Sequence, residues 1–233
     1  IQFNTGIINV NTGNVIFSSP TATHSFTNGV ININASYKLD LSRASGGPVY
    51  NISGTTFSGM GRLEVSQSAI ANILFPLIIS TKLAINAATI NDAIGINPGE
   101  VTLENGGTYD GTGSPTFGNG FIWTYGTLTG SGIINVTGSA TVSTTNAHTI
   151  SGSKELHISG AAAFNNITLT MSGTAKIIIK PTGNLTWDTP TTKSLSGLAA
   201  NTFGIESGGV FTKTGLGDLS IAATIEFNAG TIH

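Results

Sequence analysis

Apolar and polar side chains alternate over short stretches of this chain, and each stretch follows a pair of small residues. In residues 129–136, TGSGIINV, the apolar Ile134 and Val136 flank the polar Asn135. A period of two places the flanking side chains on one face of a β-strand and the middle side chain on the other. The pattern therefore predicts short, half-buried strands, and the glycine before each strand gives the backbone freedom to turn a tight corner.

The same motif recurs along the chain at nearly regular intervals. Its clear copies are residues 58–65 (SGMGRLEV), 129–136 (TGSGIINV), 151–158 (SGSKELHI), 172–179 (SGTAKIII) and 214–221 (TGLGDLSI), and a degenerate copy is residues 196–198 (SGL). The start positions of successive clear copies differ by 71 (129 − 58), 22 (151 − 129), 21 (172 − 151) and 42 (214 − 172). These intervals are near multiples of about 21 to 24 residues, a period that is typical of solenoid proteins.

A repeat of this length holds a few short strands and as many corners, which predicts one coil of a parallel β-helix. Stacked coils hydrogen-bond to their neighbours and bring the flanking residues into continuous aliphatic columns. With about 22 residues per coil, the 233 residues make about ten coils. A sandwich of β-hairpins would explain the short strands but not a motif in fixed register. We therefore expect an all-β fold, a single β-solenoid domain over residues 1–233, because no linker or change in composition divides the chain.

Residues 66–125 depart from this regular pattern. Alternation is weak between residues 70 and 99, where the apolar run 73–79 (ILFPLII) contains a proline. We expect this run to be a core strand or a buried contact surface. Residues 100–127 are rich in glycine and carry several aromatic side chains, so a feature specific to this protein is expected within residues 66–125.

The two ends of the chain resemble each other. Residues 1–8 (IQFNTGII) match residues 225–232 (IEFNAGTI) at an offset of 224 (225 − 1), about ten coils. Either the two segments are coils of one consensus, or the chain is one period of a longer tandem array. Neither end carries a polar cap, and an open strand edge is a template for pairing with another chain. We therefore expect a segment or repeat unit of a longer protein or a stacking subunit of a fibre, which associates end to end or with adjacent repeats.

The composition narrows the class of partner. Only 9% of the residues are charged, the net charge is −2, and no basic stripe is present, which argues against a nucleic-acid partner.

The longest apolar run is too short to cross a membrane as a helix, so we expect no membrane insertion. The chain has no cysteine, which excludes disulfides and thiolate chemistry and fits an extracellular protein. Because the sequence begins at Ile1 without a basic and apolar leader, we expect any signal peptide to have been removed or to lie outside this sequence.

Several segments carry a resemblance to a known class of proteins: residues 126–138 (GTLTGSGIINVTG), 183–187 (GNLTW), 207–215 (SGGVFTKTG) and 227–232 (FNAGTI). They resemble the repeats of large secreted bacterial β-helix proteins, the autotransporter-like and adhesin-like surface proteins. The resemblance covers residues 126–233 well and residues 1–65 more loosely. It implies a right-handed parallel β-helix on or outside the bacterial cell surface. It also implies a non-enzymatic role in adhesion or in building a filament, with no catalytic motif to transfer.

A carbohydrate-active β-helix is the alternative function, because such enzymes cluster carboxylates on one face. The densest acidic region contains Asp92, Glu100, Glu104 and Asp110, whose positions differ successively by 8 (100 − 92), 4 (104 − 100) and 6 (110 − 104). These spacings match no calcium-loop motif, and the carboxylates would meet only if the coils brought them together. The interpretation favoured by the sequence is scattered charges that face solvent, with no catalytic residue and no cofactor.

Other candidate sites are weak. Tyr109, Trp123 and Tyr125 are the best candidates for glycan binding, because exposed aromatic faces stack on sugars, although Trp123 would also suit the core. The four histidines, His24, His148, His157 and His233, lack metal-ligand spacing, so no metal site is expected. The glycine-rich segments 111–114 and 130–132 lack the lysine and helix of a phosphate loop and are interpreted as turns.

Ice binding is a minor alternative of a different class. It requires a flat array of threonines in Thr-x-Thr rows on successive coils. The pairs Thr21/Thr23, Thr168/Thr170 and Thr212/Thr214 do not recur at one coil period, which argues against such an array.

Overall fold

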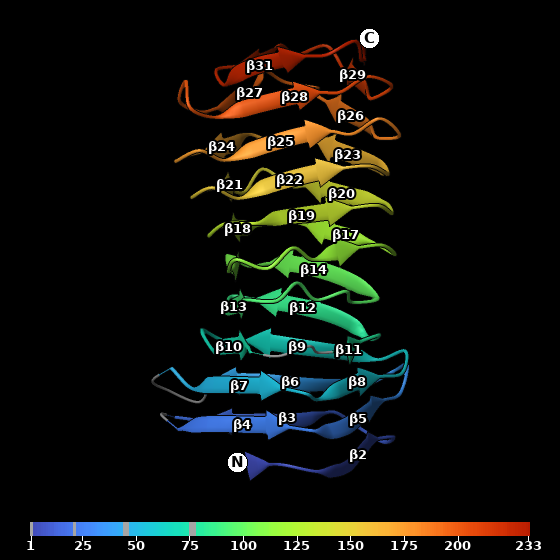
Figure 1. Cartoon of the computed structure of the whole chain (residues 1–233), viewed down its shortest axis with the longest axis vertical. Coiled ribbons are helices and arrows are strands. Elements are labelled where there is room, and N and C mark those ends of the chain that lie inside the picture. The colour runs from blue at the N-terminus through green and yellow to red at the C-terminus, as the bar shows by residue number, and fades with distance from the viewer. Residues whose placement is uncertain (1, 21, 44–46, 75–77) are drawn as a thin grey trace.

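The computed structural model describes residues 2–20, 22–43, 47–74 and 78–233, and these residues form strands and turns without any helix. Every strand pair in the described residues is parallel, and the coils lie one above another along a straight stack (Figure 1). The two longest sheets contain eleven strands each, which corresponds to about ten turns of the chain. The predicted all-β parallel β-solenoid is therefore confirmed.

Sheet A is the first of the two long sheets and receives one strand from each coil. In spatial order it contains β1 (Gln2–Phe3), β4 (Thr23–Thr27), β7 (Val49–Ser53), β10 (Ile70–Ile73), β13 (Thr89–Asp92), β15 (Gly107–Asp110), β18 (Gly126–Leu128), β21 (His148–Ile150), β24 (Leu169–Met171), β27 (Lys193–Ser196) and β30 (Leu219–Ile221).

Sheet C, the second long sheet, likewise receives one strand from each coil. It contains β3 (Val15–Ser19), β6 (Lys38–Arg43), β9 (Arg62–Ser66), β12 (Lys82–Asn86), β14 (Glu100–Glu104), β17 (Phe121–Trp123), β20 (Ala140–Ser143), β23 (Ala161–Asn165), β26 (Asn184–Asp188), β29 (Val210–Thr214) and β32 (Thr231–Ile232).

The third side of each coil lies between its strands of sheets A and C, and it is divided into two shorter sheets. Sheet B contains β2 (Gly6–Val10), β5 (Gly29–Ile33), β8 (Thr56–Ser58) and β11 (Ile78–Ile79). Sheet D contains β16 (Thr116–Phe117), β19 (Ile133–Val136), β22 (Glu155–Ile158), β25 (Lys176–Ile179), β28 (Thr202–Ile205) and β31 (Thr224–Phe227). The coil that contains β13 and β14 forms no strand on this side, so residues 93–99 separate sheets B and D.

Coil length varies more than the sequence motif suggests. Paired residues of sheet A are Ile70, Thr89, Thr108 and Thr127, whose positions increase by 19 at each of the three steps (89 − 70, 108 − 89, 127 − 108). The next three steps lead from Thr127 to its partners in β21, β24 and β27, and they measure 22 (149 − 127), 21 (170 − 149) and 26 (196 − 170). The short coils explain why residues 66–125 depart from the repeat: they shorten or lose the strand on the third side.

The five clear motif copies all turn their flanking apolar side chains toward the core, but they do not all lie in the same sheet. The copies at residues 129–136, 151–158 and 172–179 stand in register in β19, β22 and β25 of sheet D. The copy at residues 58–65 lies in β9 of sheet C, and the copy at residues 214–221 lies in β30 of sheet A. In every copy the flanking pair alternates inward, as predicted. The expectation that all five form one set of columns is wrong, because the corners between the sheets use the same small-residue sequence.

The similar chain ends also occupy different faces. Phe3 lies in β1 of sheet A, whereas its counterpart Phe227 lies in β31 of sheet D. The offset between the two ends is therefore not a whole number of coils, because variable coil lengths accumulate along the stack. Within the apolar run 73–79, Ile73 and Ile79 are buried in the core and Ile78 is exposed, while residues 75–77 lie outside the described residues.

Glycines at the corner between sheets A and D allow the coils to approach closely. Gly152 has φ +72°, and a Cβ atom there would lie 2.3 Å from the carbonyl oxygen of Gly130 in the preceding coil. Gly173, at φ +69°, has the same relation to Gly152, also at 2.3 Å. These positions need glycine both for the left-handed backbone and for the space, so their role is geometric, as the sequence predicts.

The core is a continuous column of apolar side chains between the three sides. Aliphatic residues stack in register, as in Leu39, Leu63 and Leu83 of sheet C, each at most 1% exposed. Aromatic side chains fill the wider parts of the core; Phe164 and Trp187, for example, pack edge to face with ring centroids 5.0 Å apart. Burying one such side chain contributes roughly 1.5–3 kcal/mol, so the stack is stabilised along its whole length.

Candidate functional site

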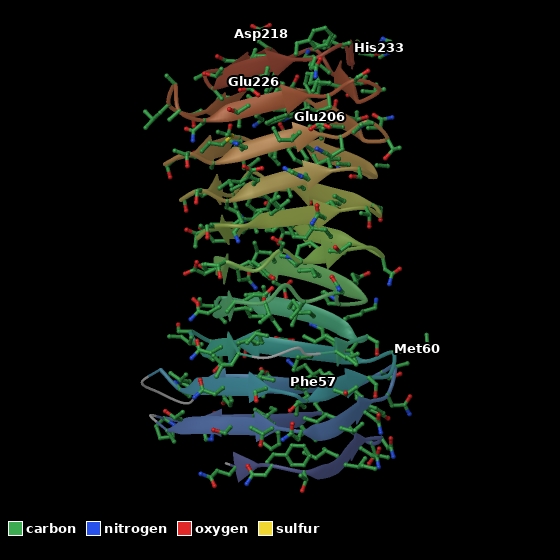
Figure 2. The ribbon with its side chains drawn as sticks, viewed as in Figure 1. Phe57, Met60, Glu206, Asp218, Glu226 and His233 are labelled. Atoms are coloured by element: carbon green, nitrogen blue, oxygen red, sulfur yellow. The ribbon has the colours of Figure 1, made fainter. Side chains whose placement is uncertain are left out.

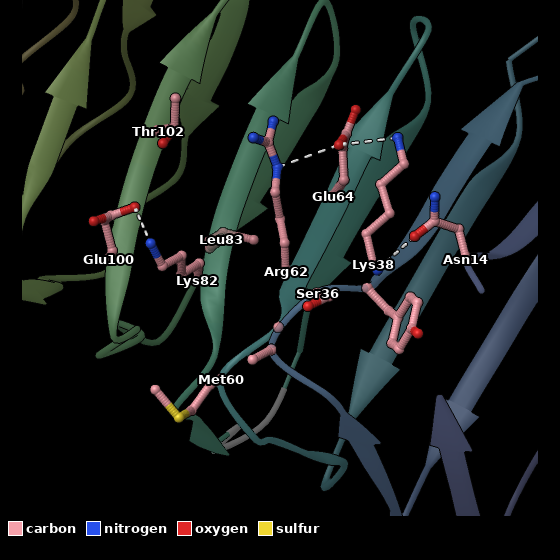
Figure 3. Close-up of a pocket in the computed structure, with 13 residues that line it drawn as sticks. Asn14, Ser36, Lys38, Met60, Arg62, Glu64, Lys82, Leu83, Glu100 and Thr102 are labelled. Carbon is pink, nitrogen blue, oxygen red and sulfur yellow. Dashed lines mark hydrogen bonds and ion pairs between the residues drawn. The ribbon is translucent and has the colours of Figure 1, made fainter. Parts of the chain in front are cut away.

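Charged side chains are sparse in this chain, yet they gather on the outer face of sheet C. Seven of the 20 charged residues (9 Lys and Arg plus 11 Asp and Glu) have described side chains on β6, β9, β12 and β14: Lys38, Asp40, Arg62, Glu64, Lys82, Glu100 and Glu104. An open groove of about 450 Å³ runs along this face, which we call the charged groove (Figure 3).

Strand register brings these charges together from distant parts of the sequence. Lys38 pairs with Arg62, Arg62 with Lys82, and Lys82 with Glu100, so the four residues form one column across four strands. Asp40 and Glu64 form the neighbouring column, because residues two apart in a strand share a face. Asn14 and Met60 contribute to the rim of the groove.

The charges of the groove are joined in ion pairs that cross from strand to strand. Lys38 Nζ lies 3.2 Å from a carboxylate oxygen of Asp40 and 3.2 Å from one of Glu64. Arg62 Nε lies 3.2 Å from Glu64 Oε2, and the Arg62 guanidinium donates to Glu104 two coils away. The ion pairs therefore link β6, β9 and β14 directly.

Lys38 is the electrostatic centre of this network. Burial lowers the pKa of Lys38, but the hydrogen bonds and negative charges of Glu64 and Asp40 raise it more, so its pKa lies above the ordinary value. The side chains of Asp40 and Glu64 are each only 8% exposed, which protects these pairs from screening by salt. The network is expected to hold the coils in register.

Lys82 differs from the other two cations of the charged groove. Its side chain is 56% exposed, and its Nζ lies 3.4 Å from Glu100 at the open end of the groove. Asp40, Glu64 and Glu104 are already paired with Lys38 or Arg62. The more exposed pair of Lys82 and Glu100 is therefore the part of the groove that suits weak binding of a polar ligand.

A second polar cluster is buried beneath sheet A, at the coil without a third strand. Asp92 is fully buried, and its carboxylate accepts backbone N–H bonds from Ile94 (3.0 Å), Gly95 (2.8 Å) and Ile96 (3.0 Å). The Tyr109 hydroxyl donates to the same carboxylate. One side chain therefore accepts three consecutive backbone N–H groups in the middle of residues 93–99, while the N–H groups of Ala93 and Gly99 donate to backbone carbonyls of the preceding coil.

Lys154 supplies a buried positive charge near this carboxylate. It is fully buried, and its Nζ donates to the carbonyl of Gly111 at 2.8 Å and to the carbonyl of Ser131. Burial lowers the pKa of Lys154, and the charges of Asp92 and Asp110 partly reverse that effect. Burial also raises the pKa of Tyr109 well above its ordinary value, as do the charge and hydrogen bond of Asp92.

The structure separates the three aromatic residues that the sequence offers for glycan binding. Tyr109 is 1% exposed and Trp123 is fully buried, so both ring faces contact the core instead of a ligand. Tyr125 is 39% exposed at the corner between β17 and β18. The expected exposed cluster does not form, because Tyr109 and Trp123 stand at inward positions of their strands; only Tyr125 retains an accessible ring.

The acidic region of the sequence does not converge either. Asp92 is buried, Glu100 lines the charged groove, and Glu104 lies on the same outer face of sheet C. Asp110 ends β15 of sheet A, where its carboxylate accepts the N–H of Gly111 at 2.6 Å. The coils therefore distribute these carboxylates over two faces and the interior.

The histidines are likewise dispersed. His24 stacks on Tyr50, His148 is buried in the core, and His157 pairs with Glu155 at 2.9 Å on sheet D. His233 is exposed near the end of the stack. In the ranges that the structure describes, no three His, Cys, Asp or Glu residues stand close enough to hold a metal ion.

The threonine rows differ from the expectation of the sequence. Thr212 and Thr214 lie in β29 of sheet C, Thr168 lies outside any strand, and Thr21 lies outside the described residues. A different set of threonines does recur once per coil on sheet A. Sequence reasoning missed this set, although the positions of Thr127, Thr149 and Thr170 differ by 22 (149 − 127) and 21 (170 − 149).

The described residues contain no helix with the length and apolar character of a membrane span. Comparison of the chain with protein-family models, with curated proteins and with solved structures finds no match.

Proposed function

We propose that this chain is a non-enzymatic structural and adhesive module of an extracellular surface protein or filament of bacteria. The observation that carries the proposal is the continuity of sheets A and C, each with eleven parallel strands through the whole described stack. Inter-coil hydrogen bonds and a continuous apolar core resist bending, so such a stack acts as a rigid rod. The outer columns of the rod are repetitive surfaces that suit contact with an extended partner.

The last described coil supports end-to-end assembly of such rods. Ile225 and Phe227 stand in register with Phe203 and Ile205, which belong to the core. The core residues are 1% exposed, whereas Ile225 and Phe227 are 53% and 55% exposed. Figure 2 shows Glu226 near the same end of the stack. We propose that another β-coil covers this surface, from a second copy of the chain or from an adjacent repeat.

The test combines electron microscopy with sedimentation velocity over a range of protein concentrations. We expect rods that lengthen in multiples of one chain, and we expect Phe227→Lys to prevent the lengthening because it places a charge on the contact surface. Met60→Lys is the matched control, because Met60 is 77% exposed on the corner between β8 and β9, several coils away from the stacking surface. A particle that stays monomeric at every concentration would contradict the assembly proposal.

The carbohydrate-active alternative is tested on the same preparation. Incubation with a panel of polysaccharides should release no reducing ends. Turnover that is lost in Glu104→Gln or Asp110→Asn, with the fold intact by circular dichroism, would overturn the non-enzymatic assignment and favour the alternative.

A further inference from the structure

One outward column of sheet A carries a hydroxyl side chain in six successive coils. Each member is the direct partner of the next: Thr89, Thr108, Thr127, Thr149, Thr170 and Ser196. Thr170 is exposed and the other five are half-buried, whereas the strand positions on either side of each threonine are buried. We call this set the threonine column.

A second column lies two residues further along the chain, within β13 and β15 and directly after the ends of β18, β21 and β24. It holds asparagine or aspartate in β13 and β15 and hydroxyl residues in the next three coils: Asn91, Asp110, Thr129, Ser151 and Ser172. Ser151 Oγ donates to Thr129 Oγ1 at 2.7 Å, which shows that the two residues lie directly above one another. Three successive coils therefore present Thr-x-Thr or Thr-x-Ser rows, and together the columns form a two-dimensional hydroxyl array.

The spacing of the array follows from β-sheet geometry. Neighbouring strands lie about 4.8 Å apart, and residues two apart in a strand lie about 6.6 Å apart. Sheets normally twist, but stacks supported by side-chain ladders stay flat. Sheet A has such a ladder that leads up to the array, where Asn72 Nδ2 of β10 donates to Asn51 Oδ1 of β7 at 2.9 Å and Asn91 Nδ2 of β13 donates to Asn72 Oδ1 at 2.8 Å. Within the array, Ser151 and Thr129 continue a ladder of side-chain hydrogen bonds. Figure 1 shows β13, β18, β21 and β24 one above another along the same side of the stack.

The chemistry of the array is neutral and rigid. No charged side chain stands in either column between Thr127 and Ser196, whereas seven charged side chains lie together on β6, β9, β12 and β14 of sheet C. Threonine is β-branched and has few χ1 states, so its hydroxyl and methyl groups are held in nearly fixed positions. Within the described residues, the hydroxyls of Thr127 and Thr149 have no protein hydrogen-bond partner, so they remain available to water.

From this geometry we propose that the hydroxyl array of sheet A binds the surface of ice. The repeats of the array, in both directions, are comparable to the oxygen spacings on crystal faces of ice. Hydroxyl groups match the donors and acceptors of the water lattice, and the threonine methyl groups fill the gaps between them. Because the side chains are ordered before binding, little conformational entropy is lost when the protein attaches. A carbohydrate surface fits less well, because the two columns contain no aromatic ring on which a sugar would stack.

This activity is independent of the assembly proposed above, since it uses a lateral face and not the end of the stack. The direct assay is thermal hysteresis of the purified protein, together with inhibition of ice recrystallisation. We expect the wild-type chain to shape ice crystals and to arrest their growth below the melting point. Thr149→Tyr, at the centre of the threonine column, should lose most of this thermal hysteresis because the larger ring lifts the face from the ice.

Thr186→Tyr is the matched control, because Thr186 occupies an outward position in β26 of the other long sheet. Circular dichroism and thermal unfolding show whether each variant keeps the fold. Absence of thermal hysteresis and of recrystallisation inhibition in the folded wild-type chain would overturn the proposal, as would equal loss in the Thr149 and Thr186 variants. Binding to crystalline cellulose or chitin that depends on Thr149, without any effect on ice, would also overturn it and would assign the array to a polysaccharide.

Discussion

Replacement of Asp92 by asparagine tests whether a single buried carboxylate supports the coil that lacks a third strand. In the wild-type chain, Oδ1 accepts the N–H groups of Ile94 and Gly95, and Oδ2 accepts the N–H of Ile96 and the hydroxyl of Tyr109. Asparagine keeps one acceptor oxygen, but it places an NH₂ group where the second carboxylate oxygen accepted two hydrogen bonds, so that donors face a donor. Two of the four contacts are therefore lost or reversed.

The expected cost follows from the number and type of these contacts. A hydrogen bond to a charged group contributes about 1.5–3 kcal/mol, so the loss of two such bonds costs roughly 3–6 kcal/mol. The substitution also removes a negative charge near the buried Lys154, and an uncompensated buried charge costs about 3–5 kcal/mol when its partner is removed. These terms overlap, so we expect Asp92→Asn to lower the free energy of unfolding by about 4 kcal/mol. At roughly 3 °C per kcal/mol for a chain of this size, the Tm should fall by about 12 °C.

The assay joins global stability with a local measurement. Urea unfolding followed by circular dichroism reports the change in free energy, and amide hydrogen exchange reports the protection of Ile94, Gly95 and Ile96. We expect exchange at these three amides to accelerate more than exchange in β25, which lies several coils away. Asp218→Asn is the control, because Asp218 is exposed and its replacement should change stability by less than about 0.5 kcal/mol.

A double-mutant cycle with Lys154→Met separates the two parts of the cost. If Asp92 also offsets the charge of Lys154, the double variant should be more stable than the sum of the single effects by at least about 1 kcal/mol. The reasoning would be refuted if Asp92→Asn changed the free energy of unfolding by less than about 1 kcal/mol and left the three amides protected.

Three further predictions concern other parts of the stack. Gly152→Ala should lower the free energy of unfolding in urea by about 2–4 kcal/mol, because the added Cβ would meet the carbonyl oxygen of Gly130. Gly13→Ala, at a similar φ but with nothing within 4 Å of the added Cβ, should lower it by only about 1 kcal/mol. Equal losses in the two variants would contradict the steric argument. Burial and the charge of Asp40 raise the pKa of Tyr50 to about 12. The stability that the protonated Tyr50 hydroxyl contributes is therefore present below pH 10 and lost as the pH rises toward 12. Ultraviolet difference spectra should show this late titration, and Tyr50→Phe should remove it. Burial lowers the pKa of His148 more than its backbone hydrogen bonds raise it. The stability that the neutral His148 ring contributes is therefore present above pH 6.5 and lost as the pH falls. An NMR titration that gives His148 a pKa of 6.5 or higher would disprove this prediction.

The fold was predictable from the sequence because the signals are local. Alternation in residues 133–136 and the glycines at the corners appear directly in the sequence, and their recurrence indicates stacked coils. The assignment of motif copies to faces was not predictable in the same way. Residues 58–65 and 129–136 share a sequence pattern but lie on different sheets, since the unequal coil lengths shift the register that a constant period assumes.

The candidate sites depend on register and were therefore hidden. The positions of Lys38, Arg62 and Lys82 differ by 24 (62 − 38) and 20 (82 − 62), and no sequence motif marks these intervals. The burial of Trp123 could have been inferred from its alternation with Phe121, because both occupy inward positions of one strand. The threonine column left a partial signal in the spacing of Thr127, Thr149 and Thr170, but the shorter coils below Thr127 conceal its lower half.

Residues 66–125 form the short coils, and they carry strands of both sheet A and sheet C. The three shortest coils could have shifted every outward column, yet sheets A and C pass through them without interruption. On the third side the strands shorten or disappear, since β11 and β16 are two residues long and residues 93–99 form no strand, and the corner from sheet C to sheet A has only two residues in each of these coils (87–88, 105–106 and 124–125). Asp92 supports the segment without a strand, because its carboxylate accepts the backbone N–H groups of Ile94, Gly95 and Ile96. Residues 93–99 connect β13, which carries Thr89 of the hydroxyl array, to β14, which carries Glu100 of the charged groove. We therefore expect a substitution that loosens the contacts of Asp92 to disturb both faces together.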